Sequence, residues 1–150
     1  MIFAIERLED CWDEMVALAE RHWNEVQNVR LKEEGFNPKY ERYKQQEDWG
    51  SFLQFTARKD GVMVGYAGLY IVQSMHSQRL ICTEDAWYLV PEERKGFAAI
   101  RFFKFMENEC RKRGVWSVTL TVPDSSGAGK IHKFLGYETV GTMSYKRLAP

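Results

Sequence analysis

The residues best suited to chemistry lie between a strand that ends at Pro91 and a helix that begins near residue 97. Backbone N–H groups at a helix N-terminus, where the helix dipole is positive, bind anions, and small side chains there leave room for a phosphate. The sequence therefore predicts a phosphate-binding turn; the alternative is an ordinary loop with a solvated basic surface. The turn and the start of the helix comprise Arg94, Lys95, Gly96, Phe97, Ala98 and Ala99.

Two adjacent carboxylates, Glu84 and Asp85, lie in the strand that precedes this turn. A carboxylate can accept a proton from an amine, which makes either residue a candidate general base. Side chains alternate between the two faces of a strand, so only one of the two can point into a given cleft. We favour Asp85, because a charge in an otherwise apolar stretch needs a reason. The alternative is a carboxylate held at the strand start by hydrogen bonds or an ion pair.

Two further patterns fail on spacing. Residues 127–130 read Gly-Ala-Gly-Lys, but a Walker A loop also needs Gly at 124 and Ser or Thr at 131, where this chain has Asp124 and Ile131. The second pattern is that of the cysteines, Cys11, Cys82 and Cys110, which indicates neither a disulfide framework nor a zinc site. From the cysteines, the sequence therefore predicts no metal site and a reduced, cytoplasmic environment.

The composition indicates a folded protein without a dominant charge. The chain has 150 residues, of which 45% are hydrophobic and 14% aromatic, and this length suits a single domain over residues 1–150. Its 21 basic and 21 acidic residues cancel, which argues against nucleic acid as a partner. No stretch approaches the roughly 18 apolar residues of a membrane span. Glu6 and Arg7 follow the N-terminus too closely for a signal peptide.

The pattern of apolar residues, turns and caps predicts a mixed α/β domain with helices on both faces of a sheet. Asp60 and Gly61 mark a hairpin turn. Gly65 and Gly68 in the strand that follows indicate a bulge or a close backbone approach. The expected order is β-α-α-β-β-β-α-β-α-β. Its strands are expected at residues 2–7, 52–57, 62–72, 80–90, 115–122 and 137–148, and its two longest helices end near residues 26 and 113.

With these residues in this order, the chain resembles the GNAT superfamily of acetyl-CoA-dependent N-acetyltransferases, in particular its small single-domain bacterial and phage members. The family's cofactor motif has Gln or Arg at its first position, Gly at its fourth, and Gly or Ala at its sixth. Here Arg94 and Ala99 fill the first and sixth positions, while Phe97 stands at the fourth and Gly96 comes one residue early. The resemblance implies that backbone N–H groups of this turn hold the pyrophosphate of acetyl-CoA.

A second family motif, which lines the pantetheine channel, fits the C-terminal region. Counting back from the Gly-aromatic pair at residues 136–137, Ser125, Ala128 and His132 take the positions of a polar residue, an Ala and a Tyr. The family's Tyr donates a proton to the departing thiolate, and the resemblance gives this role to His132. An imidazole is chemically able to do so. The alternative donors are Tyr137 and Tyr145.

The resemblance implies a GNAT fold, with a central mixed sheet of about six or seven strands flanked by about four helices. The strands at residues 80–90 and 115–122 would run parallel and splay apart around acetyl-CoA. Backbone groups of Trp87, Leu89 and Val90 would pair with its pantetheine arm. Four aromatic residues would cover the acceptor side, either as a cage for an amine or as core packing, namely Trp23, Tyr40, Tyr43 and Trp49.

By this resemblance, we expect the chain to transfer an acetyl group from acetyl-CoA to a primary amine by direct attack, with CoA as the other product. The acceptor could be a small molecule, or the lysine or N-terminus of a protein, and a homodimer is compatible with the family. The alternative is a GNAT-fold binding or inhibitory protein that acts on a protein partner without turnover. Phe97 in the turn and the absence of Tyr at position 132 favour that alternative.

Overall fold

The chain forms a mixed sheet whose strands follow one another in sequence order. The computed structural model describes residues 1–25, 33–122 and 127–150. The sheet order is β1-β2-β3-β4-β5, and every neighbouring pair is antiparallel except β4 and β5. The elements are β1 (Ile2–Ile5), α1 (Leu8–Glu25), α3 (Tyr40–Asp48), β2 (Phe52–Lys59), β3 (Val62–Gln73), β4 (Leu80–Leu89), a 3-10 turn (Pro91–Glu93), α4 (Ala98–Lys112), β5 (Ser117–Thr119) and α5 (Ala128–Phe134).

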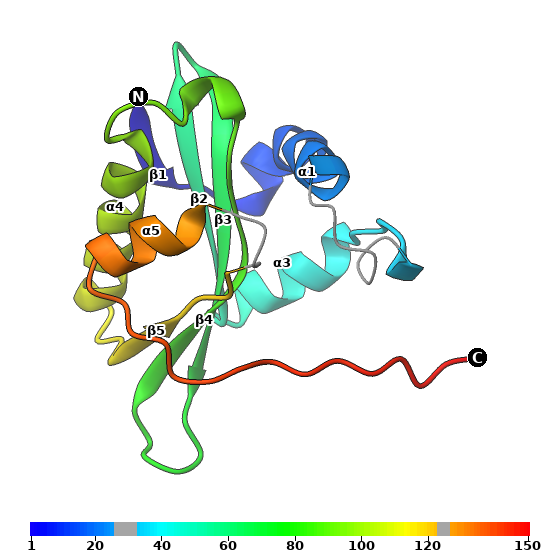
Figure 1. The fold of residues 1–150 in the computed structure, drawn as a ribbon. Coiled ribbons are helices and arrows are strands. Elements are labelled where there is room, and N and C mark those ends of the chain that lie inside the picture. Colours follow the sequence, from blue (N-terminus) through cyan, green and yellow to red (C-terminus); the bar gives the residue numbers. More distant parts are fainter. Residues whose placement is uncertain (26–32, 123–126) are drawn as a thin grey trace.

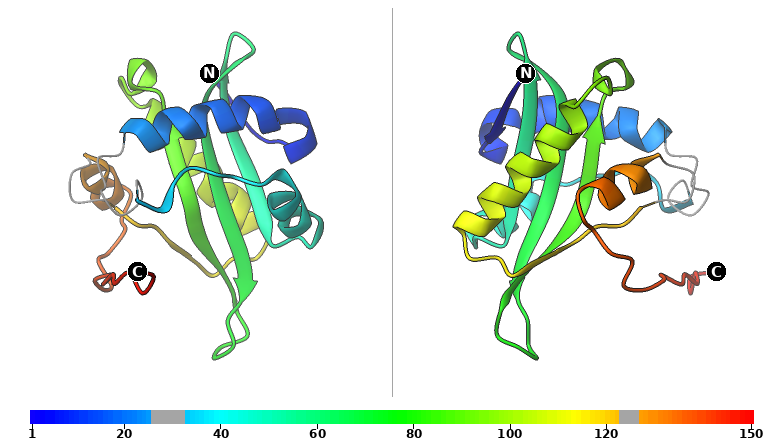
Figure 2. Two further views of the ribbon diagram at one scale, coloured as in Figure 1. Left: turned by 90° about the vertical axis from the view of Figure 1, so that its right-hand side faces the viewer. Right: turned by 60° about the vertical axis from the view of Figure 1, so that its left-hand side comes forward.

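Two pairs of helices cover the two faces of the sheet. Helices α1 and α3 lie on one face and α4 and α5 on the other (Figure 1), and the turned views show α1 and α4 crossing opposite sides (Figure 2). Each long helix buries one stripe of residues spaced three or four apart, which is the spacing of a single helix face. In α1 the buried residues are Leu8, Cys11 and Met15, and in α4 they are Ala98, Phe102, Phe103, Met106 and Cys110.

Two bulges interrupt the pairing of β3, each beside a glycine. In the pairing of β2 with β3, Val64 is an extra residue of β3 and lies next to Gly65. In the pairing of β3 with β4, Asp85 is an extra residue of β4, because Glu84 and Ala86 pair with the consecutive residues Leu69 and Gly68. A Cβ atom at Gly68 would lie 2.8 Å from the Phe52 ring, which is closer than such atoms approach. The bulge and the close approach predicted from the two glycines are therefore confirmed.

The described sheet has five strands rather than the six or seven expected. Residues 137–148, predicted as a final strand, pair with no described strand. This segment leaves α5, passes the edge of the sheet that β4 and β5 form and ends on the α3 side (Figures 1 and 2). Its side chains Val140, Met143 and Leu148 are exposed. A strand needs a hydrogen-bonded neighbour for its backbone, and β5 offers only the three residues Ser117–Thr119.

Strands β4 and β5 run side by side only at the beginning of β4. Their parallel register joins residues 81–83 to Ser117–Thr119, and β4 then continues to Leu89 without a described strand on that side. The expected parallel pair is therefore present, but β5 spans only Ser117–Thr119 of the predicted strand 115–122 and pairs with β4 over its whole length, so the splay between the two strands stays a prediction.

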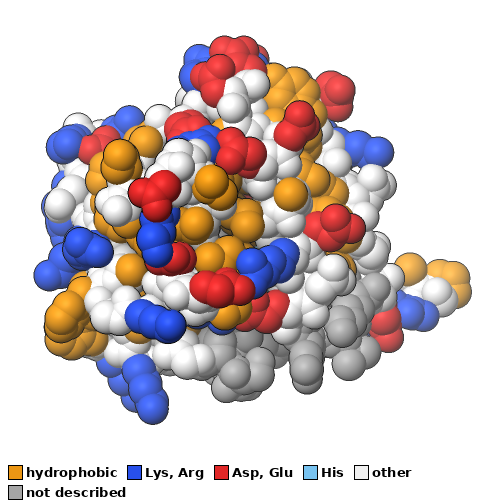
Figure 3. Space-filling model, turned by 90° about the horizontal axis from the view of Figure 1, so that it is seen from above, with side chains coloured by type: hydrophobic (Ala, Val, Ile, Leu, Met, Phe, Trp, Pro, Cys, Tyr) orange, Lys and Arg blue, Asp and Glu red, His pale blue; other side chains and the backbone are white. Residues whose placement is uncertain are grey.

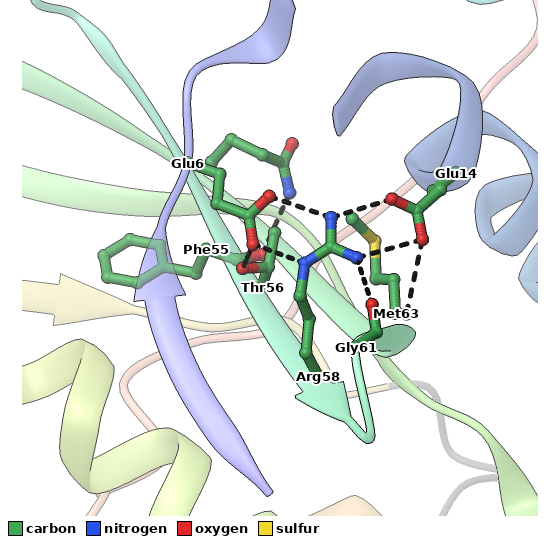
Figure 4. A network of polar contacts seen from close by, with 8 residues as sticks. Glu6, Glu14, Phe55, Thr56, Arg58, Gly61 and Met63 are labelled. Carbon is green, nitrogen blue, oxygen red and sulfur yellow. Dashed lines mark hydrogen bonds and ion pairs between the residues drawn. The ribbon is translucent and has the colours of Figure 1, made fainter. Parts of the chain in front are cut away.

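An arginine on β2 ties α1 to the sheet (Figure 4). The Arg58 guanidinium donates to both carboxylate oxygens of Glu6 at 2.8 and 2.9 Å, and to both of Glu14 at 2.8 and 3.0 Å. Thr56 also donates to Glu6, at 2.6 Å. The hydrogen bonds from Arg58 hold the pKa of both glutamates below their usual range. This network fixes the start of α1 above β2.

The surface carries both signs of charge. On the face seen in Figure 3, Lys and Arg side chains lie among Asp and Glu side chains instead of forming a patch of one sign. None of the helices in the described part of the chain is both long and apolar enough to cross a bilayer.

Candidate active site

The bulge in β4 decides which face of the sheet the Asp85 side chain occupies. Simple alternation would place residue 85 on the face of Trp87, whose ring stacks on Phe103 of α4 at 4.5 Å. The extra residue shifts the alternation, and Asp85 instead contacts Tyr43 of α3 on the opposite face. Glu84 contacts the chain after β5. The two adjacent carboxylates therefore point apart.

Asp85 lies in the wall of a cavity of about 300 Å³ between the sheet, α1 and the segment that leads into α3. This volume is at the small end of the range for ligand pockets. Aromatic side chains from four parts of the chain share the wall, namely Trp23 of α1, Phe36 of the segment before α3, Tyr43 of α3 and Tyr66 of β3. The cavity therefore combines a carboxylate with aromatic surfaces.

The predicted aromatic acceptor side divides into two groups. Trp23 and Tyr43 line the cavity. Tyr40 instead packs against Trp12 of α1, with ring centroids 5.3 Å apart, and Trp49 is 68% exposed at the end of α3. Only the first two therefore face the space beside Asp85.

Two tyrosines hold the Asp85 carboxylate. Tyr43 Oη donates to Asp85 Oδ2 at 3.1 Å, and the Tyr70 hydroxyl on β3 also donates to this carboxylate. Partial loss of solvent raises the pKa of Asp85, and the two hydrogen bonds, which stabilise its ionised form, oppose that rise. A carboxylate with a raised pKa that still reaches solvent is suited to accepting a proton.

Glu84 titrates near neutrality at the point where the pairing of β4 with β5 ends. Burial raises the pKa of its carboxyl to about 7, the backbone N–H of Thr121 lowers it, and the charge of Asp85 raises it again. The Thr121 nitrogen lies 3.2 Å from Glu84 Oε2. Glu84 therefore joins β4 to the chain after β5 where no backbone pairing remains.

Arg94 belongs to a chain of polar contacts that links the turn after β4 to α1. Its Nη1 pairs with Glu25 Oε1 at 2.6 Å, and its Nε donates to the Leu89 carbonyl oxygen at 2.7 Å. The Tyr88 hydroxyl donates to the other Glu25 oxygen at 2.8 Å, and His22 of the cavity wall stacks on the Tyr88 ring at 4.7 Å. The residue predicted to bind an anion is thus held in place by protein groups.

The N-terminus of α4 presents backbone donors without helical partners. Its N-cap residue, Phe97, makes no side-chain cap, and the N–H of Arg101 donates to the Phe97 carbonyl oxygen at 2.9 Å. The N–H groups of residues 98–100 precede that bond, so the helix supplies no acceptor for them. Gly96 has φ +60°, and Phe97 is 69% exposed. The ring that replaces the family's glycine therefore lies in solvent and does not fill the turn.

The outer half of β4 directs free backbone groups toward β5. In an antiparallel strand, successive residues direct their backbone N–H and C=O groups alternately toward the partner strand and away from it. Because Val90 donates to the Val64 carbonyl oxygen at 2.9 Å, Trp87 and Leu89 direct their N–H groups away from β3. The Val90 N–H is bonded to Val64 and its carbonyl oxygen accepts from Glu93, which disfavours the pairing of Val90 with a pantetheine arm, and that pairing stays a prediction.

Similarity to known proteins lies in the fold. No protein-family model and no curated protein sequence matches the chain. A ribosomal-protein-alanine N-acetyltransferase from Brucella melitensis biovar Abortus 2308 matches with a TM-score of 0.74 and 16% identity, over 99% of this chain and 100% of that one. An aminoglycoside acetyltransferase from an uncultured soil metagenomic sample gives 0.78 and 13%, over 99% and 100%. Aminoglycoside N-acetyltransferase AAC(6′)-Iy in complex with CoA gives 0.72 and 15%, over 99% and 100%. The chain has the GNAT fold.

In this GNAT fold, the residues predicted for the cofactor run from the end of β4 into α4. Arg94, Lys95 and Gly96 form the turn, while Ala98 is buried and Ala99 is half-buried at the start of the helix. The structure therefore brings this group together. Of the second motif, Ser125 lies outside the described residues and Ala128 is the first residue of α5.

His132 of this chain lies on the opposite face of the sheet from Asp85. It is buried on α5, and its ring packs against Phe103 at 5.2 Å and Tyr137 at 5.4 Å. Desolvation lowers the pKa of His132, so the neutral imidazole dominates at pH 7. This environment opposes the proton-donor role predicted for His132, and that role stays a prediction.

The sequence reasoning missed three residues beside Asp85. Gln54 and Tyr66 line the cavity, and Tyr70 donates to the carboxylate. The signal that could have found them is Gly68, because Tyr66 and Tyr70 share its face of β3 by alternation and Gln54 is its register partner on β2. A glycine that marks a bulge thus also marks the face on which the cavity lies.

Proposed function

We propose that this protein is an acetyl-CoA-dependent N-acetyltransferase that acts on the primary amine of a small molecule. The observation that carries the proposal is the position of Asp85, which the bulge directs into a cavity on the α1 and α3 face of the sheet, two residues after the pairing of β4 with β5 ends at Thr83. Free backbone donors continue from this point along β4 to the N-terminus of α4. The shared fold with AAC(6′)-Iy, solved in complex with CoA, supports the choice of cofactor.

The residues along the gap fit acetyl-CoA. The N–H groups of residues 98–100 would hold the pyrophosphate, with Lys95 adding positive charge. The Leu89 N–H and the indole N–H of Trp87 would donate to carbonyl groups of the pantetheine arm. The indole N–H is buried and has no partner in the described part of the chain, so an acceptor there would remove the penalty of an unpaired buried donor.

Asp85 would perform the proton transfer that the reaction requires. The acceptor binds as an ammonium ion, and Asp85 takes one of its protons to leave a nucleophilic amine. Acetyl-CoA supplies the acetyl group as a thioester, whose C–S bond breaks as the C–N bond forms, and CoA leaves as the thiol with a second proton from the nitrogen. Asp85 then returns its proton to water. Tyr43 and Tyr70 keep the carboxylate oriented throughout.

A small molecule is the acceptor that the cavity favours. Similar solved structures include acetyltransferases of aminoglycosides and of a ribosomal-protein alanine. A volume of about 300 Å³ walled by α1 and the segment before α3 suits a free amine better than the N-terminus or lysine of a folded protein. Three unpaired, buried cysteines agree with a cytoplasmic location.

Calorimetric titration with acetyl-CoA, with ATP as the negative control, tests the proposal. We expect saturable binding of acetyl-CoA alone; a ligand at a hundred times its Kd raises the free energy of unfolding by about 2.7 kcal/mol, which also raises Tm. Ala99→Glu places a carboxylate beside the expected pyrophosphate and should abolish binding. Lys104→Glu, on an exposed position of the same helix, should retain it. Absence of binding by the wild type, or full binding by Ala99→Glu, contradicts the proposal.

A further inference from the structure

The cavity beside Asp85 carries a single charge. Among the described residues that line it, Asp85 is the only Asp, Glu, Lys or Arg. His22 is also in the wall, but burial lowers the pKa of its imidazole, which therefore stays neutral at pH 7. The part of the wall that the structure describes thus has one negative group and no positive one.

Gln54, His22 and Tyr66, three further polar side chains of the wall, are already bonded within the protein. The Gln54 amide donates to the carbonyl oxygens of Phe55 and Ala67 at 3.0 and 3.2 Å. His22 Nδ1 lies 2.9 Å from the Tyr66 hydroxyl. These three side chains are uncharged and already have partners, so the Asp85 carboxylate is the charged group that the described wall offers to a cation.

Apolar and aromatic groups form the remainder of the wall. Met15 and Ala19 of α1 face the cavity together with Trp23, and Phe36 packs against Trp23 with ring centroids 5.8 Å apart. Such surfaces gain free energy by covering hydrocarbon, and aromatic faces also attract an adjacent ammonium group. They carry no negative charge that could pair with a second or third ammonium group.

We infer that the acceptor is a small monoamine, with one ammonium group for Asp85 and an apolar or aromatic body for the rest of the cavity. The inference rests on the proposed function and narrows its substrate class. An ammonium group that is taken out of water is stabilised only when it pairs with an opposite charge. Asp85 can pair with one such group. A polyamine or a multi-ring aminoglycoside would bring further ammonium groups against aromatic walls.

A matched pair of amines tests the inference. n-Hexylamine and 1,6-diaminohexane have the same carbon chain and differ only in the second ammonium group. We expect kcat/KM, measured as release of CoA thiol from acetyl-CoA, to be at least about tenfold higher for hexylamine. 2-Phenylethylamine should be accepted as well, whereas spermidine and neamine should be poor acceptors. Equal or better turnover of the diamine, spermidine or neamine overturns the inference.

A second carboxylate in the wall should reverse this preference. Ala19→Asp adds one inside the cavity, and Ala17→Asp makes the same change on the exposed side of the same helix. We expect Ala19→Asp to raise the diamine-to-monoamine ratio of kcat/KM at least about tenfold and Ala17→Asp to leave it unchanged. An unchanged ratio in a folded Ala19→Asp variant contradicts the assignment of this cavity.

Calorimetric titration of the same two amines into the wild-type protein distinguishes an error in the substrate class from an error in the proposed function. Tighter binding of hexylamine than of diaminohexane supports the monoamine class without any turnover, and the reverse order overturns it. Failure of every amine to release CoA, with hexylamine bound, contradicts the proposed function alone. Transfer that favours the polyamines contradicts the substrate class alone.

Discussion

The Tyr43 hydroxyl on α3 donates a 3.1 Å hydrogen bond to the Asp85 carboxylate at the bulge of β4. This contact joins the helix that walls the cavity to the residue at which the strand departs from regular pairing. It stabilises the ionised carboxylate, and it fixes the direction in which Asp85 faces the cavity. The chemistry proposed for the site depends on both effects.

Removal of the carboxylate should abolish proton transfer while preserving the fold. We expect Asp85→Asn to lower kcat with hexylamine by about a hundredfold or more, because an amide cannot accept the amine proton. Its Tm and its affinity for acetyl-CoA should stay close to those of the wild type. A variant that keeps full kcat would remove Asp85 from the mechanism.

Loss of the Tyr43 hydroxyl should shift the pH dependence of the reaction. The hydrogen bond favours the charged carboxylate and lowers the pKa of Asp85, so Tyr43→Phe should raise that pKa. The acidic limb of the kcat/KM profile should then move to higher pH. Trp49→Phe, at an exposed aromatic position at the end of α3, is the matched control and should leave the limb in place. No displacement in Tyr43→Phe contradicts the role of Asp85 as base.

Glu84 should make the native state less stable as pH rises from about 4.5 to 7. Its folded pKa is raised to about 7 from a usual value of 4.5, so between these values the folded state holds a proton that the unfolded chain has lost. The free energy of unfolding falls with pH across that window. Glu84→Gln should flatten this fall in urea titrations at several pH values. An unchanged slope would show that Glu84 ionises normally.

The Arg58 network should contribute measurably to stability. Arg58→Met leaves the partly buried Glu6 and the Glu14 carboxylate without their partner, and we expect a loss of about 2 kcal/mol in urea unfolding at pH 7. The folded pKa values of both glutamates are depressed, so this stabilisation is present above about pH 4.5 and is lost as pH falls through their folded values. Lys59→Met, which removes an exposed pair with Glu93, should cost clearly less, because solvent screens an exposed ion pair. Equal losses in the two variants would contradict the network's role.

Gly68 should tolerate no side chain. A Cβ atom there would lie 2.8 Å from the Phe52 ring and 3.4 Å from Asp85 Cβ, so Gly68→Ala must displace the floor of the cavity. We expect a loss of about 1 to 3 kcal/mol in stability, together with a fall in kcat/KM. Gly141→Ala, where a Cβ atom meets nothing within 4 Å, serves as the control. Wild-type activity in Gly68→Ala would show that the cavity floor is not part of the site.

The order of the elements could be predicted from the sequence as far as α5, because its signals are local. The Asp60-Gly61 turn, the three- and four-residue spacing in α4 and the glycines of β3 each act within a few residues. Residues 137–148 have the composition of a strand, but pairing depends on a distant partner that composition does not specify. The strand count was therefore predicted too high.

The carboxylate pair could also be found from the sequence, but the cavity could not. Counting alternation along β4 places Asp85 on the face of Trp87; the bulge that turns it lies opposite Gly68, where the Phe52 ring of the neighbouring strand leaves no room for a side chain. Likewise, the low pKa of His132 depends on Phe103, which packs against it from another helix. Both properties come from tertiary contacts that a single sequence does not display.

Mass spectrometry of the products tests the central claim most directly. The wild-type protein is incubated with hexylamine and acetyl-CoA labelled with carbon-13 in the acetyl group, beside Ala99→Glu and a protein-free control. We predict labelled N-acetylhexylamine and one CoA thiol for each molecule of it, formed by the wild type alone. Labelled acetate in place of the amide, or the same yield of amide without protein, would contradict the assignment as an N-acetyltransferase.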